Sequence, residues 1–219
     1  PYRDRSDKAV RTHGDVSFSQ GGSFYVLMYG MKHYGLVPEE VMRPGAMYGD
    51  SLSNHTELSA VSDAVVAAIA KGRLSSLQTD AEGTPLWKKA IESIHEIYLG
   101  EAPDTFTYNG KEYTPMSFYE STGLNPDDYV SLTSYTHHPF YSQFVLEIPD
   151  NWRWALSYNL PIDELMEVFD NAIMKGYTIA WGSDVSEDGF TRDGIAVLPD
   201  AEKAQELSGS DMAHWLKLT

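Results

Sequence analysis

Apolar side chains recur every three or four residues along much of the first half of the chain, a spacing typical of helices with one buried face. In residues 23–34 this pattern predicts a buried helix, which Gly35 ends as a left-handed stop. The apolar positions that define its face are Phe24, Leu27, Met28 and Met31. Two adjacent glycines, Gly21 and Gly22, precede this helix. Because glycine weakens a helix and loses much conformational freedom on folding, the pair predicts a backbone or access requirement there.

Three further helices are predicted between residues 54 and 123. Asn54 and Glu57 have the spacing of a capping box and precede an apolar face that ends near Gly72. That face comprises Leu58, Val61, Val65 and Ile69. Thr84-Pro85 marks the start of the next helix, which ends at Gly100. Its apolar face is formed by Trp87, Ile91, Ile94 and Tyr98. A shorter helix opens at Thr114-Pro115 and ends before Gly123.

The pattern changes in the last third of the chain, where β-branched and aromatic residues predict strands at residues 130–135 and 143–148 around a turn at residues 137–139. A helix is predicted from Pro161 to Lys175, and its inward side chains are Leu165, Met166, Phe169 and Ile173. The apolar run YTIAWGS, residues 177–183, is predicted as a strand, and a capped helix is predicted from Ser210. Helices followed by strands mixed with one helix indicate an α+β fold.

Composition narrows the classes of function. The 219 residues contain 32 acidic and 16 basic side chains, a formal charge of −16, which opposes binding to nucleic acid and to anionic membranes. No segment resembles a signal peptide or a membrane span. The chain has no cysteine, so these residues supply neither a disulfide nor a thiolate ligand nor a thiol nucleophile.

Candidate metal and nucleophile motifs are weak. His137 and His138 are adjacent and favour a turn over a shared metal ion, and no H-x-x-x-H spacing occurs. The acidic residues Asp184, Glu187 and Asp188 lack EF-hand spacing and indicate a solvated turn. Without a G-x-S-x-G elbow or another recognisable set, we assign no catalytic residue and no metal ligand.

Three ordered segments carry a family resemblance: HGDVSFSQGGSF, YLGEAPDTFTYNGKEYTPMSFYE and YNLPIDELMEVFDNAIMKGYTIAWGSDV. Together they resemble the bleomycin hydrolase and aminopeptidase C branch of the papain-like cysteine peptidases. The resemblance implies a partial α+β papain-like cysteine peptidase fold with a helical insertion. Residues 1–50 would belong to the helical half of the core, residues 51–123 to the insertion and residues 124–219 to the β-rich half.

The same resemblance implies a peptide-binding site around the two glycines. Gly21 and Gly22 would form one wall of a cleft, where the absence of side chains lets an extended peptide hydrogen-bond to the main chain. Ser23 and Phe24 would line the neighbouring subsite, and the segment around Gly182 would face it from the other side.

The family's reaction needs a cysteine, a histidine, an asparagine and a glutamine, and none of those motifs is present in these residues. Gln20, His13 and His214 do not match them. We therefore expect the chain to be an internal portion of an intact enzyme, which agrees with the proline at position 1 and with the predicted helix interrupted at Thr219. The alternative is a catalytically inactive relative that serves as a peptide-binding scaffold.

For the intact protein, the resemblance implies a cysteine aminopeptidase that takes peptide substrates and needs no metal or organic cofactor. It also implies a homohexamer and, by family only, a cytoplasmic location, with the alternative that a preceding segment carries a signal peptide. A reading outside this family is a carbohydrate-binding domain in which exposed aromatic residues among Trp152, Trp154 and Tyr158 stack on sugars.

Overall fold

The computed structural model describes residues 2–16, 18–19, 21–43, 49, 54–72, 78–182 and 190–197. The chain divides into two compact units. The first unit comprises Pro1–Tyr129 and Glu147–Ala155, and the second comprises Val130–Leu146 and Leu156–Thr219. We call Glu147–Ala155 the return segment, because it brings the chain back to the first unit. Each unit is described by itself below.

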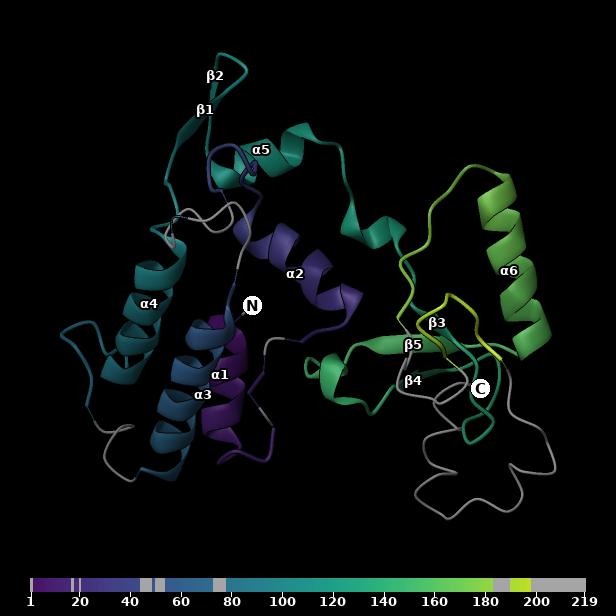
Figure 1. Cartoon of the computed structure of the whole chain (residues 1–219), viewed down its shortest axis with the longest axis horizontal. Coiled ribbons are helices and arrows are strands. Elements are labelled where there is room, and N and C mark those ends of the chain that lie inside the picture. Colours follow the sequence, from purple (N-terminus) through teal and green to yellow (C-terminus); the bar gives the residue numbers. More distant parts are fainter. Residues whose placement is uncertain are drawn as a thin grey trace. The chain divides into compact units, whose positions relative to one another are not determined.

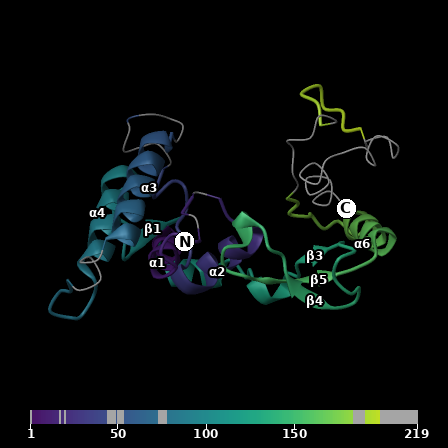
Figure 2. The same ribbon diagram turned by 90° about the horizontal axis from the view of Figure 1, so that it is seen from below.

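The first unit is built mainly on helices α1 (Tyr2–Arg11), α2 (Phe24–Tyr34), α3 (Thr56–Lys71) and α4 (Leu86–Leu99). Figures 1 and 2 show α3 and α4 side by side, and α1 packs against both. The buried centre of this packing consists of Ala9, Val66, Trp87 and Ile91. Burying a side chain such as Ile91 contributes about 1.5–3 kcal/mol, so this cluster is a main source of the unit's stability.

A hairpin and a short helix complete the first unit. Strands β1 (Phe106–Tyr108) and β2 (Lys111–Tyr113) pair antiparallel, and the two residues between them, Asn109 and Gly110, both have positive φ, as a type I′ turn requires. Helix α5 (Pro115–Ser121) starts with a reciprocal capping box between Thr114 and Ser117. Two short 3₁₀ turns, η2 (Pro126–Asp128) and η3 (Pro149–Asn151), also belong to this unit.

Gly35 ends α2 with φ of 77° and lies against the start of α5. A Cβ at this position would overlap the main chain of Pro115. Its own neighbour Leu36 donates a hydrogen bond to the Pro115 carbonyl at 2.9 Å. Glycine is therefore required both by the backbone conformation and by the close approach of α5.

The second unit contains a three-stranded sheet in the order β3-β5-β4 and the helix α6 (Ile162–Met174). The central strand β5 (Leu156–Asn159) is parallel to β3 (Leu132–Thr133) and antiparallel to β4 (Gln143–Val145). Asn159 at the end of β5 is fully buried and binds the loop that joins β3 to β4. This buried amide ties the loop to the sheet.

The predicted helices are present, which confirms the helical pattern of the first half, but some details were wrong. The capping box at Asn54 does not form: Asn54 Oδ1 accepts from the Thr56 N–H at 3.1 Å, and His55 is the N-cap residue without a side-chain cap. Phe24 and Leu27 are exposed, whereas Val26, Met28 and Met31 are the buried residues of α2. In α3, Leu58 is buried as predicted, but Ser62 and Val66 are the other buried residues, and Val65 and Ile69 are only partly buried.

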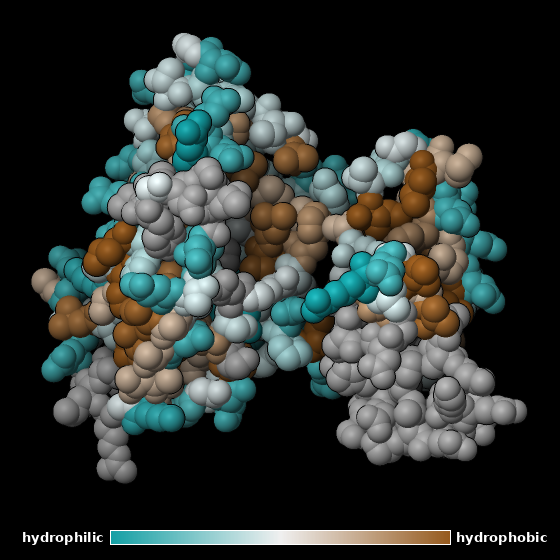
Figure 3. Space-filling view, viewed as in Figure 1, coloured by the Kyte–Doolittle hydropathy of each residue, from teal (hydrophilic) through white to brown (hydrophobic). Residues whose placement is uncertain are grey.

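The strand predictions need larger corrections. The two predicted strands exist in shortened form as β3 and β4, but each pairs with β5, a strand that the sequence pattern did not predict. Residues 177–182 form no strand. Met166 and Ile173 of α6, predicted to pack inward, are exposed, and Figure 3 shows apolar atoms at the surface along α2 and α6.

The observed mixture of helix and sheet confirms the α+β composition. The division at residues 50 and 123 stays a prediction. Ser183, the acidic turn at residues 184–188 and the helix from Ser210 lie outside the described residues. Across the described ranges, every helix is too short or too polar to cross a membrane.

Candidate functional site

The two glycines lie in an exposed loop immediately before α2, and each is approached closely by the return segment or by α2. A Cβ on Gly21 would lie 2.5 Å from Asp150 Oδ1. A Cβ on Gly22 would lie 3.4 Å from the Val26 side chain and 3.6 Å from Trp152 Nε1. Gly21 therefore has a steric reason to lack a side chain, whereas a Cβ on Gly22 would make only ordinary contacts, and the access requirement at Gly22 stays a prediction.

Gly22 keeps its main-chain polar groups available. The next residue is fixed on both sides: Ser23 N–H donates to the Asp150 carbonyl at 2.8 Å, and Ser23 C=O accepts from Val26 at 2.9 Å. Within the described part of the chain, no residue forms a hydrogen bond with the main chain of Gly22. A rigidly held residue with an exposed N–H and C=O can pair with the main chain of an extended peptide.

Beside Gly22 lies a hollow of about 250 Å³. It is lined by α1, the glycine loop, the first turn of α2 and the return segment. Its lining residues are Tyr2, Arg5, Ser19, Gly21, Gly22, Ser23, Val26, Leu27 and Trp152. All of them belong to the first unit, so the hollow is complete within that unit.

Arg5 supports the hollow from α1. Only 2% of its surface is exposed, and its Nη1 donates a hydrogen bond to the Gly21 carbonyl. The guanidinium carbon also lies 5.8 Å from the centre of the Trp152 ring. Burial lowers the pKa of Arg5, and the Asp150 carboxylate opposes that shift, but an arginine remains cationic at any physiological pH. The hollow therefore has a fixed positive charge in its wall.

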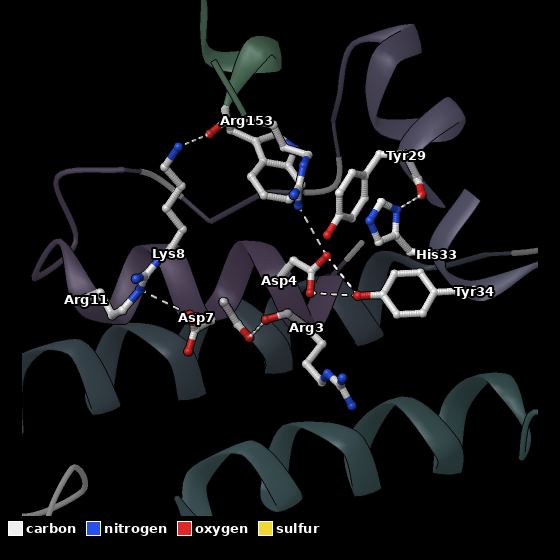
Figure 4. A network of polar contacts seen from close by, with 11 residues as sticks. Arg3, Asp4, Asp7, Lys8, Arg11, Tyr29, His33, Tyr34 and Arg153 are labelled. Atoms are coloured by element: carbon white, nitrogen blue, oxygen red, sulfur yellow. Dashed lines mark hydrogen bonds and ion pairs between the residues drawn. The ribbon is translucent and has the colours of Figure 1, made fainter. Parts of the chain in front are cut away.

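The return segment is held against α1 and α2 by a network of charged and aromatic contacts (Figure 4). Arg153 lies 3.4 Å from the centre of the Tyr29 ring and 3.2 Å from Asp4 Oδ2. Lys8 donates to the Trp152 carbonyl at 2.5 Å and lies 3.3 Å above the Trp154 ring. These contacts fix the main chain on both sides of the Trp152 indole.

Of the predicted site residues, Gly21, Gly22 and Ser23 lie together on the hollow. Phe24 is at the start of α2 but does not line the hollow, and its ring packs on Tyr129 with a centroid separation of 5.8 Å. Gly182 belongs to the second unit, where it is exposed and has open space around its Cα. The subsite role of Phe24 and the facing role of Gly182 stay predictions.

The sequence analysis missed two residues that line the hollow but lie far from the glycine pair in the sequence, Arg5 and Trp152. The burial of Arg5 could not be predicted, because the surrounding sequence is rich in charged residues and is typical of a solvent-exposed segment. Trp152 was noticed only as a possible sugar-stacking residue, and this was wrong, because its side chain is only 4% exposed. Trp154 is exposed, but Lys8 already lies on its ring, and Tyr158 is part of β5.

The side chains of His137 and His138 pack against aromatic rings. His138 stacks on Phe144 with a centroid separation of 4.0 Å, and His137 packs edge-on against Tyr135. In the portion of the chain that the structure describes, no three His, Asp or Glu side chains gather closely enough to hold a metal ion.

Comparison with known proteins places these features in context. The model of the Peptidase C1-like family matches residues 2–200. Aminopeptidase G of Lactobacillus delbrueckii subsp. lactis is 27% identical over 199 residues, which cover 82% of this chain and 44% of that protein. Aminopeptidase C of Streptococcus thermophilus is 25% identical over 205 residues, covering 83% of this chain and 45% of that protein. The chain thus spans a little under half the length of these relatives.

A solved structure shares the fold. The crystal structure of PepW from Lactobacillus rhamnosis HN001 superimposes with a TM-score of 0.63 at 21% sequence identity. The match covers 84% of this chain and 49% of that one.

Proposed function

Because the chain belongs to the Peptidase C1-like family, we propose that it forms part of a cysteine aminopeptidase, which releases residues from the free amino ends of peptides. Membership confirms the resemblance and the papain-like fold class predicted from the sequence. The relatives named aminopeptidase G and aminopeptidase C support this choice of activity.

One observation of this chain supports the proposal most strongly, namely the main chain of Gly22. It is exposed, held from both sides through Ser23 and the Arg5 hydrogen bond to Gly21, and forms no hydrogen bond with any described residue. An extended substrate would pair its own main chain with Gly22, and the lack of a side chain allows that approach. The role of these 219 residues is thus to bind and orient the peptide.

The reaction itself requires a thiolate. It attacks the carbonyl carbon of the first peptide residue, the C–N bond breaks as an imidazolium protonates the departing amine, and water then hydrolyses the thioester. Since the chain has no cysteine, the proposed nucleophile has to be supplied by residues other than these 219. Ser23, with its buried hydroxyl beside the hollow, is not placed in that role.

The test uses the polypeptide as its gene encodes it. Incubated with an aminoacyl-coumarin reporter, it should release coumarin, and a thiol alkylator should abolish the release. No turnover, or turnover that the alkylator leaves intact, would contradict a cysteine aminopeptidase. Peptide binding without turnover would instead fit the inactive scaffold, and the mass of the native particle would test the proposed homohexamer.

A further inference from the structure

The hollow beside Gly22 contains a buried hydrogen-bond donor, and we propose that it takes a substrate side chain with an oxygen acceptor, Asn or Asp in type. In this account Trp152 is a specificity-determining residue, because its indole N–H binds that oxygen. The inference rests on the proposed peptidase function and adds to it the class of substrate.

The donor is Trp152 Nε1. Trp152 is 4% exposed, and its Nε1 is buried without a hydrogen-bond partner among the described residues. Nε1 points toward the glycine loop, since a Cβ built on Gly22 would be 3.6 Å from it. Ser23 Oγ, on the same hollow, is also buried and unpartnered within the described residues. Buried polar groups in proteins are nearly always paired, so two such groups on one hollow point to a ligand that supplies the partner.

The indole cannot readily turn away from the hollow. Lys8 binds the Trp152 carbonyl, and the next residue, Arg153, is fixed by Tyr29 and Asp4. The guanidinium carbon of Arg5 lies 5.8 Å from the centre of the indole ring. The donor is therefore held in place before any ligand arrives, which lowers the entropy cost of binding.

The rest of the lining suits a short polar side chain. Val26, Leu27 and Tyr2 offer apolar contact for methylene groups, and the Arg5 charge favours an oxygen over a second donor. The Asp150 carboxylate lies at Gly21 rather than on the lining, so it does not face the indole nitrogen. At about 250 Å³, the hollow is smaller than the roughly 300–1,000 Å³ of pockets for drug-sized ligands, and so fits a single side chain.

The expected discrimination follows from the unpaired donor. Leucine has nearly the shape of asparagine but no oxygen, so a bound leucine would leave the indole N–H and the Ser23 hydroxyl without partners. A site built to hydrogen-bond a substrate group rejects an analogue that lacks it, here by about tenfold or more in kcat/KM.

The kinetic test compares tripeptides that carry Asn, Asp or Leu at the first or the second position. Release of the first residue by the encoded polypeptide is followed by mass spectrometry. At one of the two positions, Asn or Asp should exceed Leu about tenfold in kcat/KM. Trp152→Phe, which keeps a ring but removes the donor, should bring this ratio close to one, whereas Tyr98→Phe, which removes a ring donor on α4 outside the lining of the hollow, should leave it unchanged. A ratio near one in the unmodified protein, or a ratio that survives in Trp152→Phe, would overturn the inference.

A binding measurement keeps the inference testable if Trp152→Phe fails to fold or if no turnover occurs. In ¹⁵N-labelled unmodified protein, the indole N–H resonance of Trp152 should move downfield on addition of the Asn tripeptide and not of the Leu tripeptide. Ser23→Ala should reduce the affinity for the Asn tripeptide with little effect on the Leu tripeptide. Turnover without this shift contradicts only the role of Trp152, and the shift without turnover contradicts only the proposed peptidase activity.

Discussion

Arg5 and Gly21 are joined by a hydrogen bond from the buried guanidinium to the main-chain oxygen, across 16 positions of the sequence. Through this contact the first helix fixes the first glycine of the pair. A buried charge is costly unless it is well paired, so the Arg5 side chain strongly specifies this one arrangement of the loop. Arg5 is therefore a positioning residue for the glycine wall.

Replacing Arg5 by methionine should destabilise the first unit. Arg5→Met keeps an unbranched, largely apolar stem but leaves the Gly21 carbonyl without its donor, at an expected cost of about 1–3 kcal/mol in the free energy of unfolding. Urea denaturation measures it. The matched control is Arg11→Met on the same helix, since Arg11 is exposed and its ion pair among the described residues is with Asp7, at 3.1 Å. Equal effects of the two changes would contradict the role given to Arg5.

The Arg153–Asp4 pair should show measurable coupling in a double-mutant cycle. Both side chains are mostly shielded, at 21% and 22% exposed, and Arg153 also stacks on Tyr29. We expect Arg153→Met and Asp4→Asn to couple by about 1 kcal/mol in the free energy of unfolding. The Lys32–Asp127 pair, at 51% and 73% exposed, provides the comparison cycle and should couple distinctly less. Coupling of the same size in both would refute a special role for the return segment's arginine.

His95 should make the protein less stable in mild acid. Burial lowers the pKa of its imidazole below the ordinary 6.5, with only partial opposition from Glu92, and the ring lies 5.4 Å from that of Tyr2. Below pH 6.5 the unfolded chain therefore binds a proton that the folded chain resists, so stability is lost as the pH falls through this range. His95→Gln should lessen the loss between pH 7.5 and pH 5.5 in urea titrations. An unchanged loss in the variant would exclude His95 as its source.

Asn159 should be critical for the second unit. Its amide nitrogen donates to the carbonyls of Tyr135 and His138, and its oxygen accepts from the Tyr135 N–H at 2.8 Å, all with the residue fully buried. Asn159→Ala should cost about 2–4 kcal/mol because several buried groups lose their partner together. Asn171→Ala on exposed α6 serves as control, because among the described residues the Asn171 side chain makes a single hydrogen bond, to the Glu167 carbonyl. A thermal melt of Asn159→Ala that resembles the control would contradict this assignment.

Helices α2 to α6 were predictable because their signals are local, whereas α1 (Tyr2–Arg11) was not predicted from its charged sequence. The Thr114 capping box, Gly35 and Gly100 at helix ends, and the spacing of Trp87 and Ile91 all act within one or two turns. The strands depend on partners far along the chain, which periodicity cannot specify. Strand β5 has only four residues, and its two neighbours come from before it in sequence without pairing to each other.

The candidate site was predictable only in part, for the same reason. The glycine pair could be recognised in the sequence because glycine weakens a helix and yet two glycines precede one. Ser23 follows the pair as the N-cap residue of α2. The residues that contact the pair come from other parts of the chain. Arg5 belongs to α1, and Asp150 and Trp152 belong to the return segment. Each had the appearance of an ordinary surface or core residue until folding brought it to the loop.

The central claim is that the bare main chain of Gly22 binds peptide, and Gly22→Ala in the encoded polypeptide tests it most directly. The added methyl group would meet Val26 and Trp152 only at ordinary contact distances, so the free energy of unfolding should change by less than about 1 kcal/mol. Gly72→Ala, at an exposed extended glycine with φ of −78°, is the matched control. The account predicts that KM for tripeptides rises about tenfold or more in Gly22→Ala and stays constant in Gly72→Ala. A Gly22→Ala protein with an unchanged KM would contradict it.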